Sequence, residues 1–295
     1  MRNDIEFIQK LVNHIEKNLA EEINVIKLAE SFDISPWHFQ RLFKSLVGDT
    51  LGAYIRGRRL TQAAHLLLDS NLNLIDIAFD IGFSSHEAFT RSFKSHFKLS
   101  PKSFRKMRPS ILLNKKPLLS EVLFHHLAKE ITRDPIISIR QEQTIIGFDT
   151  TIPSPFYTNE NYCDALYTPW MELLKRQSEI SNRLPGSFMG LSISHSGNFT
   201  EDTIDYIAGS LITTDCPTPA GMVSYSLPEQ SVAMFEIQTV DTDTVAKTID
   251  YIYGYWLPNS SYLRGNGNDY ELFEGITSFE IPDLTSKYVI PIVPK

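Results

Sequence analysis

The chain has 295 residues, of which 42% are hydrophobic and 21% charged, and its formal net charge is −7. This composition is typical of a folded protein, and the length favours two domains over one. No apolar stretch approaches the roughly 18 residues of a membrane span, and the N-terminus lacks the apolar run and cleavage site of a signal peptide. We therefore expect a cytoplasmic protein without a membrane partner. The two cysteines, Cys163 and Cys216, belong to no CxxC motif and are expected to be reduced, although the sequence leaves a disulfide open.

Charge is distributed unevenly along the chain. Residues 1–108 contain 16 Lys and Arg against 12 Asp and Glu, whereas residues 109–295 contain 12 against 23. A basic first part suits a polyanion such as DNA, and an acidic second part disfavours DNA as its own partner.

Three helices are predicted at the start of the chain. Apolar residues at helical spacing predict the first: Phe7, Leu11, Ile15 and Leu19. Residues 24–32 predict a short second helix with Asn24 as its cap. Ser35 followed by Pro36 predicts the start of a third, because a capping residue before a first-turn proline is a common start signal. The core face of this third helix holds Phe39, Leu42, Phe43 and Leu46, and its outward face holds Trp37, Gln40, Arg41 and Lys44.

That outward face is chemically suited to DNA. Arg41 can donate two hydrogen bonds to guanine, and Gln40 can pair with adenine. Trp37 offers apolar contact to thymine methyls or sugars, and Lys44 is expected to meet phosphate. The alternative is a helix with an ordinary solvated polar face.

Residues 51–68 predict a longer helix with a glycine and three arginines inside it: Arg56, Gly57, Arg58 and Arg59. A glycine inside a helix costs about 1 kcal/mol relative to alanine, and close packing could explain its presence. The arginines either clamp phosphates or brace the domain, and the sequence leaves both alternatives open. The acidic partners for a brace would be Asp49, Asp69 or Asp76.

The same pattern returns about fifty residues later. Arg41-Leu42-Phe43-Lys44 recurs as Arg91-Ser92-Phe93-Lys94, after a short apolar helix at 74–78 and a turn at 81–84. Ser84 or Ser85 is expected to cap the second copy of the longer helix, whose core face holds Phe89, Phe93 and Phe97. Its exposed face holds His86, Glu87, Thr90, Arg91, Lys94 and Lys98. A short helix, a turn and a longer basic helix written twice predict an all-α domain with two helix-turn-helix units, each offering one helix to a major groove.

A closing helix is predicted from Ser100-Pro101 and contains Phe104, and its basic residues end the first domain, residues 1–108. Residues 109–135 are expected to be a linker with some helix. The pair His125-His126 in this linker could suggest a metal, but no further His or Cys stands at ligand spacing. We therefore expect neither a metal nor another cofactor.

Residues 136–295 predict a second, α+β domain with a repeated order of elements. Each repeat reads strand, helix, strand, strand, and Pro217-Thr218-Pro219 joins the two repeats. The predicted elements of the first repeat are a strand at 136–149, a helix at 161–180 and strands at 187–195 and 204–214. Those of the second are a strand at 230–239, a helix at 242–256 and strands at 269–281 and 287–292.

The first domain resembles the AraC/XylS family of transcription regulators over about residues 4–108. The stretches that carry the resemblance include Ser35–Lys44, Gly52–Leu60, Asp76–Phe83, Phe89–Lys94 and Leu99-Ser100-Pro101. The resemblance implies two recognition helices in successive major-groove segments. It assigns base contacts to Trp37, Gln40 and Arg41 in the first helix and to His86, Glu87 and Arg91 in the second. The family's regulators also imply RNA polymerase as a partner.

The second domain resembles the GyrI-like small-molecule-binding domain over about residues 136–292. The resemblance rests on Tyr206–Gly209, Tyr251–Ser260, Asp269–Phe273 and Tyr288–Ile292. It implies a groove that binds apolar, often cationic compounds between aromatic side chains and a buried carboxylate, for which Glu271 is the candidate. Flat aromatic faces suit such ligands through stacking and cation–π contact. The candidate aromatics are Tyr167, Trp170, Tyr206, Phe235, Trp256, Tyr270 and Phe273.

The residues therefore predict a DNA-binding regulator, an activator, whose second domain senses a small lipophilic or cationic effector. One alternative is a second domain that binds a protein partner and no ligand. Another is a hydrolase, but Gly190-Leu191-Ser192-Ile193-Ser194 breaks the G-x-S-x-G pattern at its last position, so it supplies no nucleophile elbow. The sequence assigns no partner to His195. We expect no enzyme activity.

Overall fold

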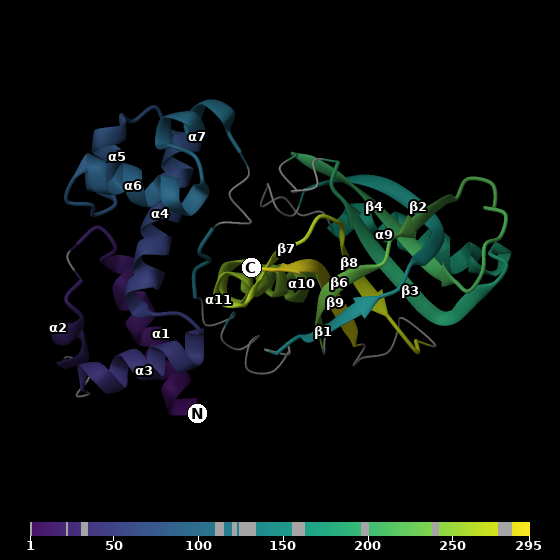
Figure 1. The fold of residues 1–295 in the computed structure, drawn as a ribbon, viewed down its shortest axis with the longest axis horizontal. Coiled ribbons are helices and arrows are strands. Elements are labelled where there is room, and N and C mark those ends of the chain that lie inside the picture. Colours follow the sequence, from purple (N-terminus) through teal and green to yellow (C-terminus); the bar gives the residue numbers. More distant parts are fainter. Residues whose placement is uncertain are drawn as a thin grey trace. The chain divides into compact units, whose positions relative to one another are not determined.

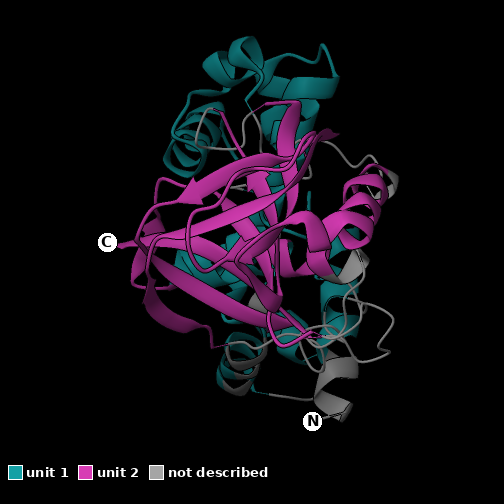
Figure 2. Ribbon diagram, turned by 90° about the vertical axis from the view of Figure 1, so that its right-hand side faces the viewer, with its two compact units in different colours: residues 1–124, 250–259 teal, residues 125–249, 260–295 magenta. Residues whose placement is uncertain are grey.

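The computed structural model describes residues 2–21, 23–30, 35–109, 115–119, 123, 134–154, 163–195, 201–237, 242–276 and 285–295. These residues belong to two compact units (Figures 1 and 2). Unit 1 comprises Met1–Phe124 and Asp250–Asn259, and unit 2 comprises His125–Ile249 and Ser260–Lys295. No helix within the described ranges is both long and apolar enough to cross a membrane.

Unit 1 is helical. Its helices are α1 (Arg2–Lys17), α2 (Val25–Glu30), α3 (Pro36–Val47), α4 (Leu51–Asp69), α5 (Leu74–Asp80), α6 (His86–Phe97) and α7 (Pro101–Met107). Two of the predicted caps are confirmed: the side-chain oxygen of Asn24 accepts from the backbone N–H of Ile26 and Lys27, and that of Ser85 accepts from Ala88. Residues Asp250–Asn259 also belong to unit 1, although unit 2 lies before and after them in the sequence. They contain a π-helical turn, Ile252–Trp256, and the short helix α11, Leu257–Asn259.

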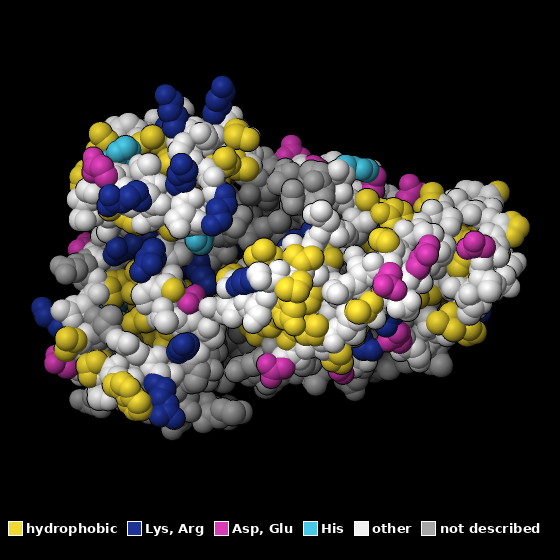
Figure 3. Space-filling model, viewed as in Figure 1, with side chains coloured by type: hydrophobic (Ala, Val, Ile, Leu, Met, Phe, Trp, Pro, Cys, Tyr) yellow, Lys and Arg dark blue, Asp and Glu magenta, His cyan; other side chains and the backbone are white. Residues whose placement is uncertain are grey.

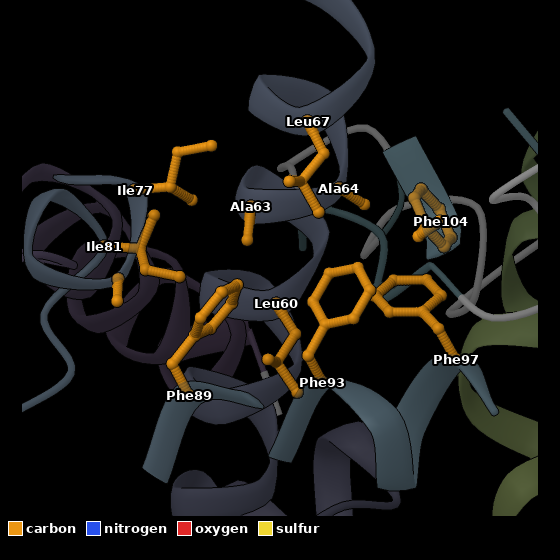
Figure 4. Close-up of a cluster of buried hydrophobic side chains, with 11 residues drawn as sticks. Leu60, Ala63, Ala64, Leu67, Ile77, Ile81, Phe89, Phe93, Phe97 and Phe104 are labelled. Carbon is orange, nitrogen blue, oxygen red and sulfur yellow. The ribbon is translucent and has the colours of Figure 1, made fainter. Parts of the chain in front are cut away.

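Helix α4 supports the second half of unit 1. One of its faces packs against α5, α6 and α7 in a buried cluster (Figure 4). The rings of Phe93 and Phe97 lie 4.6 Å apart, and the ring of Phe104 lies 5.1 Å from each of them. These contacts bury only one face of α6, so its opposite face stays accessible for contacts outside the core.

The arginines of α4 divide between two roles. Arg58 pairs with Glu16 of α1, with a nitrogen–oxygen distance of 2.9 Å. Arg59 donates to the backbone oxygens of Leu19, Glu21 and Gly82 at 2.7–2.8 Å. These two residues therefore brace the domain, although not through the aspartates that the sequence suggested, whereas Arg56 is exposed.

Unit 2 is built on one antiparallel sheet. In the described part of the chain its strands are β1 (Ile136–Arg140), β2 (Gln143–Pro153), β3 (Arg183–Ile193), β4 (Thr203–Ile212), β5 (Val223–Leu227), β6 (Gln230–Ile237), β7 (Tyr262–Arg264), β8 (Asp269–Phe273) and β9 (Ser286–Pro294). The order across the sheet is β1-β6-β9-β8-β3-β4-β2-β5, with β7 paired to β9. Its helices are α9 (Cys163–Arg176), continued by a 3₁₀ turn at Gln177–Glu179, and α10 (Thr242–Tyr251).

The two faces of this sheet differ in character. Side chains alternate between faces along a strand, so the register places Leu191, Tyr270 and Val289 together on one face, within a buried apolar cluster. The register places Gly190 and Glu271, which pair across β3 and β8, on the opposite face. Helix α9 packs over β2 and β4 on that second face, where Trp170 bonds to Tyr206.

The structure differs from the sequence-based prediction in three places. The single strand predicted at 136–149 is wrong: β1 and β2 are separate strands that pair with different partners, and exposed Gln141 and Glu142 lie between them. Strands β5 and β7 were not predicted. The helix predicted at 242–256 is regular only to Tyr251 and then widens into the π-helical turn.

Two phenylalanines test how unit 1 is held together. Phe93 is fully buried in the cluster of Figure 4, whereas Phe79 of α5 is 55% exposed. Phe93→Ala should lower the free energy of unfolding by about 3–5 kcal/mol, because it removes apolar contacts and leaves a cavity. Phe79→Ala, the matched control, should change it by no more than about 0.5 kcal/mol. Urea denaturation of both variants checks this, and similar losses in the two would contradict the packing described.

Candidate nucleic-acid interface and ligand-binding face

Helix α3 presents the predicted DNA-contacting side chains to solvent. Phe39 and Phe43 are fully buried, which fixes the helix by its apolar face, whereas the side chains of Leu42 and Leu46 lie outside the described residues. On the other face Trp37 is 68% exposed, and the Arg41 guanidinium lies over its ring at 5.3 Å from the centroid. Gln40 and Lys44 are also exposed. A guanidinium stacked on a ring keeps its N–H donors at its edge free for hydrogen bonding.

Helix α6 has a similar division but different chemistry. Phe89, Phe93 and Phe97 form its buried stripe, while Glu87, Arg91 and Lys94 are exposed. His86 and Thr90 are half-buried, and the Thr90 hydroxyl lies 3.4 Å from His86 Nε2.

The carboxylate of Glu87 lies in the first turn of α6. Its own backbone N–H and the Ser85 hydroxyl hydrogen-bond to it and hold its pKa below the ordinary range. The second exposed helix therefore begins with an ionised carboxylate, whereas the first turn of α3 contains no acidic residue.

The exposed basic residues of unit 1 extend beyond the two helices. On the face shown in Figure 3, Lys and Arg side chains are frequent over the helical unit, and Asp and Glu side chains outnumber them over the sheet unit. The exposed basic residues of unit 1 in the described ranges include Arg41, Lys44, Arg56, Arg91, Lys94, Lys98, Lys102 and Lys106. Such a surface attracts a polyanion at long range.

Three of the predicted ligand-binding aromatics lie together on the second face of the sheet. Trp170 Nε1 donates to the Tyr206 hydroxyl at 2.9 Å, and the Trp170 ring meets Phe273 edge-on with centroids 5.4 Å apart. Gly190 of β3 makes this possible, because a Cβ there would overlap the Tyr206 hydroxyl and lie 3.3 Å from the Trp170 ring. In the sequence, Gly190 stands out only as part of an incomplete G-x-S-x-G pattern. Its role in making room for the Tyr206 hydroxyl and the Trp170 ring has no local sequence signal.

Glu271 emerges on the same face, directly across from Gly190 in the β3–β8 pair. Its side chain is half-buried and not fully enclosed as the sequence predicted. Desolvation there raises the pKa of its carboxyl to about 7, and a hydrogen bond of 2.6 Å from the Ser286 hydroxyl lowers it only in part. No Lys or Arg among the described residues pairs with it. By contrast, Asp269, two residues earlier on this face, is fully buried and accepts from Arg264 at 2.9 Å.

The remaining predicted ligand contacts are placed less closely together. Phe235 is fully buried and pairs with Tyr288, which in turn pairs with Glu271, so it belongs to the same face. Tyr270 lies on the opposite face in the apolar cluster, where burial raises its pKa to about 12. Tyr167 of α9 is 66% exposed. Trp256 belongs to the π-helical turn of unit 1.

Two sequence features do not form sites in the described part of the chain. No cluster of three or more metal-ligating side chains occurs there, and His125-His126 lie outside it. Cys216 is a free thiol that donates to the Ser181 carbonyl at 3.0 Å, and the Cys163 side chain is outside the described residues.

Comparison with known proteins identifies both parts of the chain. Residues 28–107 match the helix-turn-helix domain family, and residues 134–293 match the GyrI-like small molecule binding domain. The probable transcription factor PqrA of Proteus vulgaris is 43% identical over 103 residues, which are 35% of this chain and 81% of that protein. The multiple antibiotic resistance protein MarA of Escherichia coli is 38% identical over 98 residues, 33% of this chain and 77% of that protein. The transcriptional activator AarP of Providencia stuartii is 38% identical over 98 residues, with shares of 33% and 73%.

These matches define a DNA-binding transcription regulator that carries a ligand-binding type of domain. The chain belongs to the AraC family of regulators and, over more than half of its length, to the GyrI-like family. The relatives named above match only about a third of it.

The raised pKa of Glu271 predicts a pH-dependent effect on stability. A carboxyl whose pKa rises from 4.5 unfolded to about 7 folded contributes stability that is lost as pH rises through that interval. Glu271→Gln removes this loss, so its free energy of unfolding relative to the wild type should increase by about 1–2 kcal/mol between pH 5.5 and pH 8. Urea denaturation at the two pH values measures it. Glu236→Gln, at an exposed position of β6, is the control and should show no trend; a pH-independent difference for Glu271→Gln would refute the assignment.

Proposed function

We propose that this chain is a sequence-specific transcription activator that reads DNA with α3 and α6 and is controlled by a lipophilic, cationic effector bound on the Glu271 face of its sheet. The observation that carries the proposal is the pairing, in one chain, of two exposed helices on packed phenylalanine stripes with a desolvated carboxylate beside aromatic rings. The first half matches a helix-turn-helix family, and the family that the second half matches is described as small-molecule binding.

In unit 1, α2 with α3 and α5 with α6 are the two helix-turn-helix units of the proposal. Trp37, Gln40 and Arg41 of α3 read bases, and Lys44 meets phosphate, because a bidentate guanidinium and an amide specify bases while an ammonium acts as a point charge. In α6 the proposed DNA contacts are His86, Glu87, Thr90, Arg91 and Lys94.

The two proposed readers are unequal. Glu87 is ionised at the start of α6, where it can accept from cytosine N4 but also repels nearby phosphates. The first reader therefore supplies most of the affinity and most of the base-specific contacts, and the second is the weaker reader. Two readers in one chain also let a single copy span two groove segments without a dimer's symmetry.

In unit 2 we infer a duplicated strand-helix-strand-strand module. The order β6-β9-β8 on one side of the β8–β3 pair mirrors β2-β4-β3 on the other, and one helix follows the first strand of each set. The central pair β3–β8 is then the junction between the repeats, and it carries Gly190 and Glu271. The proposed domain boundaries remain 1–108, a linker at 109–135 and 136–295.

The proposed effector site uses Glu271 for charge and aromatic faces for contact. Trp170, Tyr206 and Phe273 supply rings within the described cluster, and we keep Tyr167, Phe235, Trp256 and Tyr270 as proposed contacts. A half-buried carboxylate that has lost part of its water, with no cation paired to it in the described residues, gains from a cationic ligand that brings its charge without a tight hydration shell.

The proposal includes activation, with RNA polymerase as a partner. AarP is named as an activator, and we extend that role to this chain. The pairing of domains also resembles that of the right-origin-binding regulator, and this closer likeness stays a prediction.

We do not propose catalysis. In the described part of the sheet, the Ser194 hydroxyl donates to Glu201 and His195 pairs with Asp205 at 2.9 Å on the surface. These pairs join a hydroxyl to a carboxylate and an imidazole to a carboxylate, and neither is the serine–histidine pair of an activated nucleophile.

The proposed reader helix is tested by two substitutions in α3. Arg41→Ala should cost about 1–3 kcal/mol of binding and relax selectivity at one base pair, because a bidentate contact is lost. Lys44→Ala should weaken binding to all sequences alike and reduce the salt dependence by about one phosphate contact. Titration of the full chain against duplexes that the wild type selects from random DNA measures both, with Lys10→Ala of α1 as a surface control. Normal binding by both α3 variants would remove α3 as the reader.

The proposed effector site predicts proton-linked ligand binding. A lipophilic cation such as tetraphenylphosphonium should bind the full chain about ten-fold more tightly at pH 8 than at pH 6, because Glu271 must lose a proton with a pKa of about 7 before it can pair with the cation. Isothermal titration calorimetry measures the affinities, and Glu271→Gln should bind weakly with no pH trend. Equal affinity of wild type and variant at pH 8 would mean that the cation binds at a site without Glu271. If neither protein binds the cation, a protein partner for residues 136–295 is favoured.

A further inference from the structure

A buried lysine in unit 1 joins three parts of the chain that are far apart in sequence. Lys116 is 6% exposed, and its ammonium lies 2.9 Å from the Asp49 carboxylate, 2.5 Å from the Gly254 carbonyl and 4.3 Å from the centre of the Tyr255 ring. An anion, a carbonyl and a ring face together replace the water that a buried ammonium loses.

Close steric contacts also hold Lys116 and Pro117 in position. A Cβ on Gly57 of α4 would lie 2.9 Å from Lys116 Cβ, and a Cβ on Gly254 would overlap the Pro117 ring. The pair Lys116-Pro117 is therefore held between two glycine surfaces, which explains the glycine inside α4. The Tyr255 hydroxyl also donates to the Pro117 carbonyl at 2.6 Å, and Lys115 pairs with Asp250 at 2.7 Å.

The backbone of this stretch is fixed to α4 as well. The Lys116 N–H donates to the Thr61 hydroxyl at 2.8 Å, and the Lys116 carbonyl accepts from Arg58 at 2.9 Å. The segment 115–117 is thus attached to α4 on one side and to residues 250–259 on the other.

Asp49 connects this arrangement to the first reader helix. It lies in the short turn between α3, which ends at Val47, and α4, which begins at Leu51. One carboxylate oxygen accepts from the Thr50 N–H at 2.8 Å, and the other meets Lys116. The ion pair therefore holds the end of α3, whereas the cluster that holds α6 contains no residue of 115–119 or 250–259.

We propose that residues 250–259 are a coupling segment through which the second half of the chain controls α3 and leaves α6 unaffected. The segment lies inside the stretch that matches the GyrI-like family, yet it packs within unit 1. It is continuous in the chain with α10 before it and β7 after it. Displacement of the segment removes the Gly254 and Tyr255 partners of Lys116 and so loosens the Asp49 pair at the end of α3. Its π-helical turn, a form often found at functional positions in helices, places both partners.

Hydrogen–deuterium exchange of the full chain tests the coupling directly. Tyr255→Phe keeps the ring over Lys116 but removes the hydrogen bond to Pro117, and Gly254→Ala pushes the segment away from Pro117. We expect amides of residues 40–50 to exchange about five-fold faster in Tyr255→Phe, and faster still in Gly254→Ala, while amides of residues 90–97 keep their wild-type rates. Leu191→Ala, a core variant of unit 2, should leave both sets unchanged.

Two outcomes would overturn the proposal. If the amides of residues 40–50 exchange at wild-type rates in Tyr255→Phe, residues 250–259 pack against unit 1 without controlling α3. If the amides of both helices exchange faster by the same factor, the substitution destabilises unit 1 as a whole. If Gly254→Ala does not fold, Lys116→Met and Tyr255→Phe carry the same comparison.

A second test measures DNA binding. It rests on the proposed function of α3, so its result is interpreted separately from that of hydrogen–deuterium exchange. In duplexes selected by the wild type, Tyr255→Phe should lower discrimination about three-fold at the base pair that Arg41→Ala relaxes, and leave unchanged the one that Arg91→Ala relaxes. If Arg41→Ala itself has no effect, the reader assignment fails while the exchange result still decides the coupling. If Arg41→Ala relaxes its base pair but Tyr255→Phe relaxes neither or both, the selective control of α3 is refuted.

Discussion

The buried ammonium of Lys116 is the interaction that joins residues 115–117 and 250–259 to α4 and to the turn before it, and the proposed control of α3 depends on it. It can stay inside only because Asp49, the Gly254 carbonyl and the Tyr255 ring all reach it; removing one partner leaves a charge without solvation, at a cost of several kcal/mol. Burial also lowers the pKa of Lys116, and Asp49 opposes this. The stretch 115–117 is therefore fixed against α4, where Arg58 and Thr61 hydrogen-bond to the Lys116 backbone and Glu16 holds Arg58 in place.

Glu271 represents the opposite case in the sheet unit. Its neighbour Asp269 is buried beside Arg264 and accepts from the Tyr288 hydroxyl, so its charge is satisfied within the protein. Glu271 has the Ser286 hydroxyl and no cation among the described residues, and its pKa rises to about 7. A buried charge with a partner of opposite sign can stabilise the fold. A charge without such a partner lowers stability, and a ligand of opposite charge can provide the missing partner.

Local signals allowed the helical unit to be predicted closely. The caps Asn24 and Ser85 and the phenylalanine stripe of α6 act over three or four residues, and the observed helices begin where those signals stand. The sheet was harder, because strand pairing joins distant residues: nothing local separates β1 from β2, and a motif that contains Tyr270 and Glu271 does not say which of them faces the core. Lys116 was invisible for the same reason, since Gly254 is 138 residues away. In the linker, a lysine between another lysine and a proline has no distinguishing feature.

The two proposed reader helices, because they lie in one chain, restrict how a ligand at the proposed effector site can act on them. Control by dimerisation changes how many readers meet the DNA, but a chain that already has both can be controlled only through the geometry of one relative to the other. Buried phenylalanines hold both helices, Phe39 and Phe43 in α3 and the cluster of Figure 4 in α6, but α3 is also tied at its end by the Asp49–Lys116 pair. An apolar cluster is insensitive to small shifts of a distant segment, whereas an ion pair whose cation needs two further partners weakens as soon as they move. On the proposal, the additional ionic tie makes α3 the adjustable helix and α6 the fixed one, and α3 is also the helix to which we assign the richer set of base-specific side chains.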